Sequence, residues 1–438
     1  MMDIVDKIKK AGVVGAGGAG FPTHVKVSCK ADVVIANGAE CEPLLRVDQL
    51  IMQKYAKQIV QAMMLVMAQT GAKKGIICLK KHYHDAVTEL EKHITDKIEI
   101  MLLDGYYPAG DEQQMVYEVT GKVVPTGGLP LDVGAVVINV STLLNITNAM
   151  AGGVVTDKHV SVVGEVNKPI TIKVPIGTSY RKLIKMADGP EDDSEYTLII
   201  GGPCMGKLSN DWDDVVTKTT GGIIVLPNAH FLVGMKKDNY RRDVKLAKAV
   251  CCQCSLCTQL CPRNSMGLNV EPHKAMRAIA QEKGDLLSEV NGVFSCCDCG
   301  LCTYFACNFG LNPSAMMTRI KGELLKQGVK PKKEVYGNVD SDIDLKKVPV
   351  KRLMARLGVS KYSKDTPLIE ENFEVNSVKI PLKMHIGAPC EARVAEKTMV
   401  NKGDLIADTD KLGASIHASI DGVVTNVTNE YIEIVRRV

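Results

Sequence analysis

CCQCSLCTQLCP, at residues 251–262, and CCDCGLCTYFACN, at residues 296–308, together hold ten of the fifteen cysteines of this 438-residue chain. In each stretch three cysteines recur at intervals of two residues, and another follows after three residues in the first and four in the second. Three thiolates on one tight loop can reach three irons of a cubane, so the fourth ligand must come from elsewhere. The spacing therefore predicts two [4Fe–4S] clusters.

The fourth cysteine of each run is expected to bind the cluster of the other run, as in two-cluster ferredoxins. One predicted ligand set is Cys251, Cys254, Cys257 and Cys307. The other predicted set is Cys261, Cys296, Cys299 and Cys302. The second run departs from the bacterial pattern, because Asn308 stands where proline is usual. Cys252 and Cys297 adjoin ligands and are expected to pack as small apolar side chains.

Zinc is the competing metal, because two CxxC pairs a dozen or more residues apart form structural zinc sites. A third cysteine at the same interval is not needed for zinc but is needed for a cubane. Iron–sulfur is therefore the main interpretation, and zinc stays as the alternative.

The bulk composition is that of a globular chain, with 45% hydrophobic and 24% charged residues. A net charge of +4, with dispersed basic residues, gives no indication of a nucleic-acid partner. No apolar run reaches the roughly eighteen residues that a transmembrane helix needs. The cysteine spacing suggests a reducing, cytoplasmic compartment. Residues 1–10 are predicted to form an amphipathic first helix, with a targeting peptide as the alternative.

A glycine-rich loop follows, with five glycines between residues 12 and 20. Such a loop lets backbone N–H groups approach a phosphate. A helix precedes it instead of a strand, which argues against an ordinary dinucleotide loop. Strands at 33–36, 75–79 and 98–103 and helices at 48–70 and 85–93 then predict a Rossmann-like βαβ arrangement. We expect Asp48 to cap the first of these helices, Gly71 to end it and its methionines to lie in the core.

Four ordered motifs within residues 12–148 resemble the flavoprotein subunit of respiratory complex I and the RnfC family. They are GAGGAGFPT at 15–23, NGAECEP at 37–43, YPAGDE at 107–112 and VINVSTL at 137–143. The resemblance implies a non-covalent FMN with NADH stacked on its ring. It implies flavin phosphate and ring-edge contacts from Gly15, Gly17 and Lys26, and ring contacts from Asn37, Glu40 and Glu42. Further contacts are implied from Tyr107, Gly110, Asp111, Val137, Asn139 and Thr142, and stacking from Phe21.

The rest of the sequence divides into three more units. Residues 158–206 resemble an SLBB β-grasp domain, and residues from 380 onward resemble a barrel-sandwich hybrid. Basic residues at 236–248 indicate a solvated helix face, with a docking site for acidic ferredoxin or flavodoxin as the sharper alternative. Residues 272–283 are predicted to form a helix between the two cysteine runs.

We therefore predict a multidomain α/β and α+β protein with a Rossmann-like FMN domain, a β-grasp domain, a helical two-[4Fe–4S] ferredoxin-like domain and a barrel-sandwich hybrid. The expected boundaries are 1–155, 156–235, 236–328, a linker at 329–375, and 376–438. This domain order, with the barrel-sandwich last, resembles the cobalamin reductases of propanediol-utilisation microcompartments.

That resemblance implies an NADH-dependent oxidoreductase that passes electrons through FMN and two clusters to cobalamin or a cobalamin-handling protein. It also implies a place inside a bacterial microcompartment, whose shell would be a further partner. No side chain is expected to be catalytic, because the chemistry belongs to the cofactors. Two alternatives stay open: a relay role for proline reductase or an Rnf-type complex, and a zinc-binding scaffold with a decayed flavin pocket.

Overall fold

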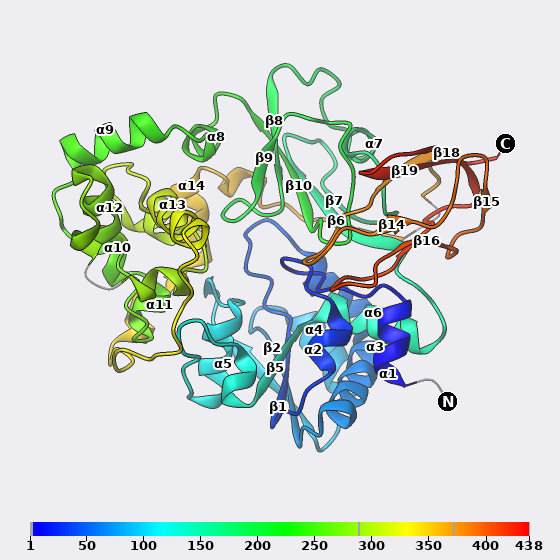
Figure 1. Cartoon of the computed structure of the whole chain (residues 1–438), viewed down its shortest axis with the longest axis horizontal. Coiled ribbons are helices and arrows are strands. Elements are labelled where there is room, and N and C mark those ends of the chain that lie inside the picture. Colours follow the sequence, from blue (N-terminus) through cyan, green and yellow to red (C-terminus); the bar gives the residue numbers. More distant parts are fainter. Residues whose placement is uncertain (1–2, 288–289, 371–372, 438) are drawn as a thin grey trace.

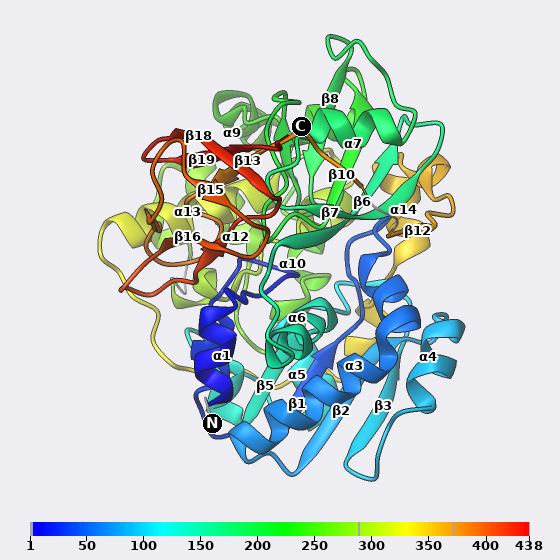
Figure 2. The ribbon, with the colours of Figure 1, turned by 90° about the vertical axis from the view of Figure 1, so that its right-hand side faces the viewer.

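The computed structural model describes residues 3–287, 290–370 and 373–437 (Figure 1). A parallel α/β unit holds the N-terminus, a six-stranded sheet lies above it, a helical unit lies to one side and a β-sandwich to the other. Seen from the side, the C-terminal sandwich lies close to the first helix of the chain (Figure 2). These four units confirm the predicted fold class.

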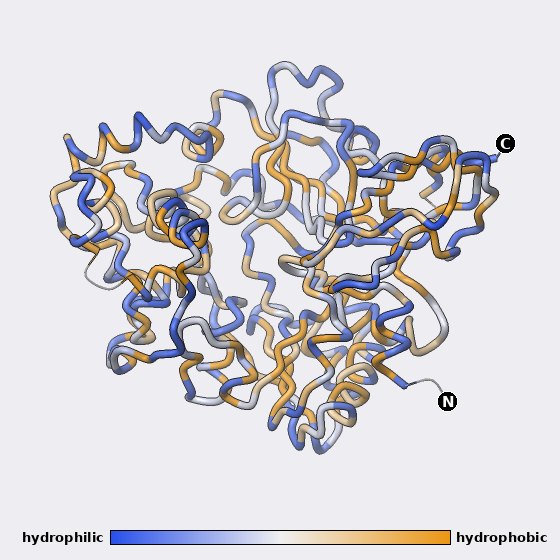
Figure 3. The backbone as a smooth tube through the Cα atoms, in the orientation of Figure 1, coloured by the Kyte–Doolittle hydropathy of each residue, from blue (hydrophilic) through white to orange (hydrophobic). Residues whose placement is uncertain are grey.

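The first unit is built on a parallel sheet in the order β3-β2-β1-β5. Its strands are β1 (Val33–Asn37), β2 (Lys74–Lys80), β3 (Ile98–Leu103) and β5 (Ala135–Asn139). Its helices are α1 (Ile4–Lys10), α2 (Thr23–Val27), α3 (Val47–Thr70), α4 (His84–Glu91), α5 (Glu112–Thr120) and α6 (Val140–Met150). The short strand β4 (Tyr106–Tyr107) and the 3-10 helix η1 (Pro130–Val133) complete it. The strands are largely apolar, as Figure 3 shows, because both faces of the sheet are covered.

Helix α3 packs directly on the sheet because two glycines leave room for its methionines. A Cβ on Gly38 would lie 2.4 Å from Met52 Sδ, and one on Gly75 would lie 2.7 Å from Met63 Cε. Both methionines are fully buried. The expectation that Met63, Met64 and Met67 belong to the core is confirmed for Met63 and Met67, and Met64 is partly buried against the same core. Gly71 ends the helix in the left-handed conformation, as predicted.

The N-terminal helix is part of this first unit. Within α1, Ile8 is completely buried, and Ile4 and Val5 pack against the same core. The first two residues of the predicted helix lie outside the described residues. The described part of the helix therefore packs as a domain helix.

The second unit is a mixed sheet in the order β12-β7-β6-β10-β8-β9. Its elements are β6 (Asp157–Gly164), β7 (Ile170–Pro175), α7 (Tyr180–Met186), β8 (Tyr196–Ile200), β9 (Lys207–Ser209), β10 (Gly222–Pro227) and β12 (Leu368–Ile369). Helix α7 packs over one face through Tyr180, Leu183 and Ile184. The order of two strands, a helix and closing strands is that of a β-grasp.

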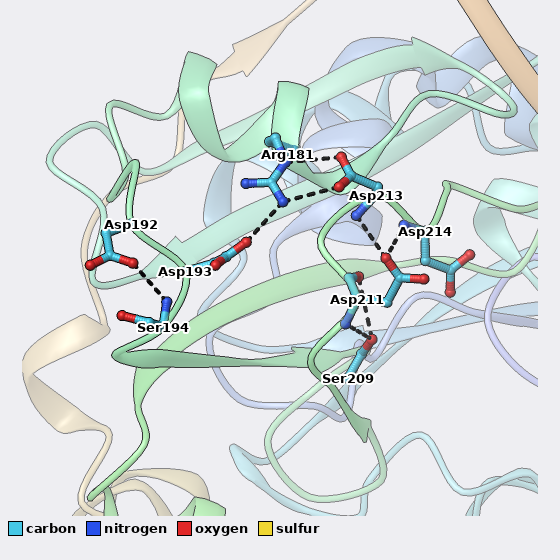
Figure 4. Close-up of polar contacts among 8 residues, drawn as sticks. All are labelled: Arg181, Asp192, Asp193, Ser194, Ser209, Asp211, Asp213 and Asp214. Carbon is cyan, nitrogen blue, oxygen red and sulfur yellow. Dashed lines mark hydrogen bonds and ion pairs between the residues drawn. The ribbon is translucent and has the colours of Figure 1, made fainter.

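Surface loops of this unit are fastened by Arg181 on α7, which pairs with Asp193 and Asp213 (Figure 4). Asp211 accepts the backbone N–H groups of Asp213 and Asp214 in the same network. The side chain of Arg181 is 42% exposed, so each pair contributes little to stability. These aspartates therefore have a local structural role, which is to hold the surface loops of the unit.

The helical unit carries both cysteine runs. Its elements are α8 (Phe231–Lys236), α9 (Tyr240–Val250), α10 (Leu256–Gln259), α11 (Pro262–Ser265), α12 (Pro272–Gln281), η2 (Gly284–Leu287), η3 (Asn291–Ser295), η4 (Cys302–Ala306) and α13 (Pro313–Lys326). The predicted helix between the runs is α12, which buries Ala275 and Ala280. Its core joins α9, α12 and α13 around the cysteine loops.

The segment at 329–375, which the sequence presents as a linker, contains η5 (Ile343–Lys346), β11 (Val348–Pro349), α14 (Val350–Leu357), η6 (Ser360–Tyr362) and β12. Strand β11 pairs with β4 of the first unit, and β12 pairs with β7 of the second. Leu353 and Leu357 of α14 are fully buried. The segment therefore binds the units together.

The C-terminal unit is a sandwich of two small sheets, β13-β19-β18-β15 and β14-β16-β17. Its strands are β13 (Ser377–Pro381), β14 (Glu391–Ala392), β15 (Met399–Val400), β16 (Leu405–Asp408), β17 (Ile416–His417), β18 (Gly422–Val427) and β19 (Tyr431–Val435). Its core is continuous with that of α1, α3 and α6. Throughout the described ranges, no helix has both the length and the apolar character needed to span a bilayer.

Candidate functional site: a flavin loop and two cysteine sets

The flavin site predicted from the sequence centres on the carboxyl ends of β1 and β5. Asn37 and Asn139 end these strands and are partners in the parallel register. Asn139 accepts the N–H of Ser141 and so caps α6, while its Nδ2 donates to Asp48 Oδ2 at 2.7 Å. The carboxyl edge of a parallel sheet is where open α/β folds bind ligands.

The glycine-rich loop closes over these strand ends. The N–H of Gly15 donates to the carbonyl of Phe21 at 2.9 Å, and the N–H of Ala16 donates to Thr142 Oγ1 at 2.9 Å. A Cβ on Gly17 would lie 2.7 Å from Asn139 Nδ2, so only glycine lets the backbone come so near. Gly17 and Gly18 are exposed, and a Cβ on Gly18 would meet nothing within 4 Å. Open backbone N–H groups at this place fit the phosphate of FMN.

Two partly buried carboxyl groups, Glu40 and Asp48, lie close to the strand ends. The carboxylate of Glu40 accepts the N–H groups of Val47 and Asp48, both at 3.0 Å, and so caps α3 from a distance. Burial, followed by the charge of Asp48, raises the pKa of Glu40 to about 8. The expectation that Asp48 caps this helix is wrong, because its carboxylate accepts instead from Asn139 and Ser141.

Two lysines of the β-grasp unit hold the glycine-rich loop at its start and at its middle. Lys158 Nζ donates to the carbonyl of Ala16 at 2.8 Å. Lys218 Nζ donates to the carbonyls of Gly12 at 2.7 Å and Ser415 at 2.6 Å. Both lysines are buried, and burial lowers the pKa of each to about 8. Sequence reasoning missed both residues; the only signal was a lysine inside or beside an apolar strand.

Three other residues predicted to contact the flavin lie either at the surface or in the core. Lys26 pairs with Glu112 at 2.6 Å, partly exposed, and Phe21 is 37% exposed. Val137 is buried in the core between the sheet and α5. Lys26 and Phe21 therefore lie at accessible surface close in sequence to the loop, and Val137 is a core residue.

Glu42 faces the β-grasp unit. Its carboxylate accepts the N–H groups of Cys204 at 2.8 Å and Met205 at 2.9 Å, and a Cβ on Gly202 would lie 2.1 Å from Glu42 Oε2. Tyr107 Oη lies 3.4 Å from Glu42 Oε1 and donates to the carbonyl of Cys299 at 2.8 Å. Glu42 therefore links the first unit to the β-grasp unit, and Tyr107 links the first unit to the helical unit that carries the cysteine runs.

Gly110 and Asp111 complete the loop that begins at Tyr107. Asn37 Nδ2 donates to the carbonyl of Gly110 at 2.9 Å, and the N–H of Gly110 approaches Cys41 Sγ at 2.6 Å. Asp111 caps α5 and forms a 2.7 Å ion pair with Arg263, with both side chains less than a tenth exposed. This loop therefore contacts both the end of β1 and the cluster unit.

Several cysteines of each predicted ligand set lie close enough to affect one another's pKa. Burial raises the pKa of Cys257 to about 12, and the charges of Cys307, Cys251 and Cys254 add to the rise. We name these four the outer cysteine set. Burial likewise raises the pKa of Cys302, and the charges of Cys296, Cys261 and Cys257 add to the rise. A hydrogen bond with Cys297 and then burial raise the pKa of Cys299, with smaller contributions from Cys261 and Cys302. We name Cys261, Cys296, Cys299 and Cys302 the inner cysteine set.

The donor sets suit iron–sulfur clusters. Buried thiols with raised pKa values, such as those of Cys257 and Cys302, ionise only when a cation compensates their charge. Among the described residues, no group of three or more His, Cys, Asp or Glu side chains has the spacing of a single-ion site. Cys252 is exposed, so the expectation that it packs as an apolar side chain is wrong. Cys297 is half-buried and pairs with Arg263.

A π-helical turn absorbs the extra residue of the second run. Residues Cys302–Ala306 form η4, in which the N–H of Cys307 donates to the carbonyl of Cys302 at 3.2 Å, five residues back. A π-turn inserts one residue into a helical path. The π-turn therefore accommodates the extra residue before Cys307, whose charge affects the pKa of Cys257.

Comparisons with known protein families give a match for each of the four units. Residues 8–148 match the Nuo51 FMN-binding domain, 159–207 the SLBB domain, 250–312 the 4Fe-4S dicluster domain and 357–437 the RnfC barrel sandwich hybrid domain. The dicluster match decides against zinc. The fold and its two centres define an iron–sulfur flavoprotein oxidoreductase with FMN and two [4Fe–4S] clusters.

The chain is 40% identical over 437 residues to the cobalamin reductase PduS of Salmonella typhimurium, covering 99% of this chain and 96% of that protein. It belongs to the family of the cobalamin reductase PduS. A component of the Na(+)-translocating ferredoxin:NAD(+) oxidoreductase complex of Acetobacterium woodii is 35% identical over 60% of each chain. A crystal structure of an NAD+-reducing [NiFe]-hydrogenase aligns at 21% identity and TM-score 0.46, over 80% of this chain and 66% of that one. That alignment is too distant to support an argument.

Proposed function

We propose that this chain is a cobalamin reductase that takes electrons from NADH. The observation that carries the proposal is its 40% identity to a cobalamin reductase over nearly the full length of both proteins. The acceptor rests on that relationship, because the chain contains no DxHxxG corrin motif. The continuous contacts from the strand ends to the cysteine loops support internal electron transfer.

Bound FMN would take a hydride from NADH and release electrons singly, and the clusters would carry them to the acceptor. The chain's part is to hold these groups in place. The exposed N–H groups of Gly17 and Gly18 would bind the flavin phosphate, and Lys26 would add positive charge. The flavin contacts at the strand ends and in the loop are assigned to Gly15, Asn37, Glu40, Asn139 and Thr142. Phe21 is assigned to stack on the adenine or the nicotinamide of NADH.

The remaining predicted flavin residues would support the site from behind. Glu42, Tyr107, Gly110 and Asp111 hold the loops that surround it, and Val137 fills the core below the strand end. The clusters are assigned to the outer and inner cysteine sets. The predicted domain boundaries are kept in this proposal, with 329–375 as the segment that fastens the units together.

The experiment is NADH-dependent reduction of cob(III)alamin by protein reconstituted without oxygen, followed by absorption spectroscopy. Cys254→Ser, in the outer set, is expected to stop cobalamin reduction and to leave flavin bleaching by NADH intact. Cys390→Ser is the control, because that cysteine is buried in the sandwich. Failure of the unaltered holoprotein to reduce cobalamin would refute the proposal.

A relay role is the second candidate, in which an acidic ferredoxin or flavodoxin, or a larger complex such as proline reductase or an Rnf-type assembly, exchanges electrons with this chain. The observation that favours it is the basic character of α9, which precedes the outer cysteine set and carries Arg241, Arg242, Lys245 and Lys248. Opposite charges steer electron-transfer partners together. Cobalamin reduction that requires an added acidic carrier protein would select this candidate.

The proposed location is the reducing cytoplasm, inside a microcompartment whose shell would be a neighbour. None of the fifteen cysteines, all of which lie in the described ranges, forms a disulfide, which suits a reducing compartment. Co-fractionation of the tagged protein with purified microcompartments would test this, and its recovery only outside them would refute it.

A further inference from the structure

We now call the first unit, which carries the predicted flavin site, the flavin unit. Three residues at or near the inner cysteine set bond to it. The carbonyl of Cys299 accepts from Tyr107 Oη at 2.8 Å. Arg263, two residues after Cys261, forms the buried pair with Asp111. Inner-set loops therefore contact the flavin unit at two separate points.

A third contact lies next to Cys296. The hydroxyls of Ser295 and Thr126 share a hydrogen bond of 2.7 Å, and both residues are buried. The flavin unit thus grips the neighbourhoods of three of the four inner cysteines. Such repeated buried contacts fix the position of a loop more strongly than one hydrogen bond can.

One loop of the flavin unit makes contact in both directions. Residues 107–111 bind the inner set through Tyr107 and Asp111, and bind the end of β1 through Gly110 and Asn37. This is the strand end to which the flavin is assigned. One short loop therefore contacts both the neighbourhood of the inner cysteine set and this strand end.

The outer cysteine set is more exposed than the inner set. Cys254 is exposed, and so are its neighbours Cys252 and Gln253. Cys307 is approached by Arg356 of α14, which donates to its carbonyl at 3.0 Å. In contrast, Cys299 of the inner set is 9% exposed.

We infer that the inner cysteine set holds the flavin-facing cluster, that the outer set holds the surface-facing cluster, and that Tyr107 is a positioning residue for the inner set. The inference rests on the proposed electron transfer from NADH through FMN. Electrons then enter at the inner set and leave one at a time from the outer set to the acceptor.

The hydroxyl of Tyr107 is well placed to tune the inner set. Tyr107 is 1% exposed, and its Oη–H donates to the backbone of a ligand residue. Hydrogen bonds and solvent exclusion around ligand residues tune the potential of a cluster. Loss of the hydroxyl is therefore expected to move the potential of one cluster only.

The first test is an EPR-monitored redox titration of reconstituted Tyr107→Phe holoprotein. Tyr106→Phe is the matched control, because the neighbouring hydroxyl bonds to Glu118 of α5 and not to a residue of either cysteine set. Signals are assigned with Cys254→Ser and Cys299→Ser, each of which removes one cluster. The signal lost in Cys299→Ser is expected to shift its midpoint potential in Tyr107→Phe and to stay unchanged in the control. A shift in the other signal alone, or in neither, would overturn the inference.

The second test distinguishes the order in which the two clusters receive electrons from the identity of the electron donor. With NADH, Cys254→Ser is expected to show a reduced inner cluster, whereas Cys299→Ser is expected to show the outer cluster reduced by dithionite only. Equally rapid NADH reduction of the outer cluster in Cys299→Ser would overturn the order. If NADH reduces no cluster in the unaltered protein, the proposed function fails, while the titration of Tyr107→Phe still tests the position of the inner set. That titration also decides the matter if Cys299→Ser does not fold.

Discussion

Replacing Arg263 by methionine is expected to destabilise the junction between the flavin and cluster units. Arg263 and Asp111 form a 2.7 Å ion pair with 8% and 9% of their side chains exposed. Methionine keeps much of the length of the side chain but leaves the Asp111 carboxylate buried without a cation. Breaking a buried pair from one side costs about 3–5 kcal/mol. For a folded unit of about 150–250 residues, a loss of this free energy of unfolding lowers the unfolding midpoint by on the order of 10 °C.

Arg181→Met is the matched control, because it breaks two ion pairs at the surface, where the side chain is 42% exposed. Its expected cost is at most about 1 kcal/mol. Thermal unfolding of reconstituted holoprotein, followed by circular dichroism without oxygen, measures both variants. In the double variant Arg263→Met/Asp111→Asn, the amide still caps α5 but carries no charge, so much of the stability is expected to return. Equal losses in the two single variants, or no recovery in the double variant, would refute the argument.

Three further results are expected near the flavin loop. Lys26→Ala is expected to weaken FMN binding by about 1–3 kcal/mol, the range for charge-assisted hydrogen bonds, and equal flavin retention after gel filtration would contradict the assignment. Gly17→Ala is expected to displace the loop and lower flavin content, because its Cβ would lie 2.7 Å from Asn139 Nδ2; normal FMN affinity by fluorescence titration would contradict this. The folded-state pKa of Glu40 is raised from 4.5 to about 8, so its stabilising contribution is present below pH 4.5 and is lost as pH rises to 8. Glu40→Gln is expected to flatten this fall in the unfolding midpoint, and an unchanged pH profile would count against it.

Local sequence patterns predicted the chemistry because cofactor ligands sit at short, regular spacings. The cysteine runs predicted two ligand sets that exchange Cys261 and Cys307, and the structure adds a π-turn that accommodates the extra residue before Cys307. The glycines at 15–20 indicated a loop near a ligand. These signals depend on the residues themselves and on a few neighbours in the chain.

Contacts between distant units could not be predicted in the same way. Glu42 and Tyr107 lie in motifs of the flavin unit, yet they bond to Cys204 and Cys299, 162 and 192 residues away. Nothing in the composition of residues 329–375 announces that they add a strand to two different sheets. Glu40, and not the nearby Asp48, caps α3 because the chain folds back to bring its carboxylate to the helix start.

The two buried lysines of the β-grasp unit limit how the protein can be divided in the laboratory. A fragment ending at residue 155 would keep the glycine-rich loop but lose Lys158 and Lys218, which hold the carbonyls of Ala16 and Gly12. It would also lose the N–H of Ile386, which donates to the carbonyl of Gly20 at 3.1 Å. The glycine-rich loop thus takes its shape from three units, so crystallisation or binding studies of an excised first unit would examine a different loop.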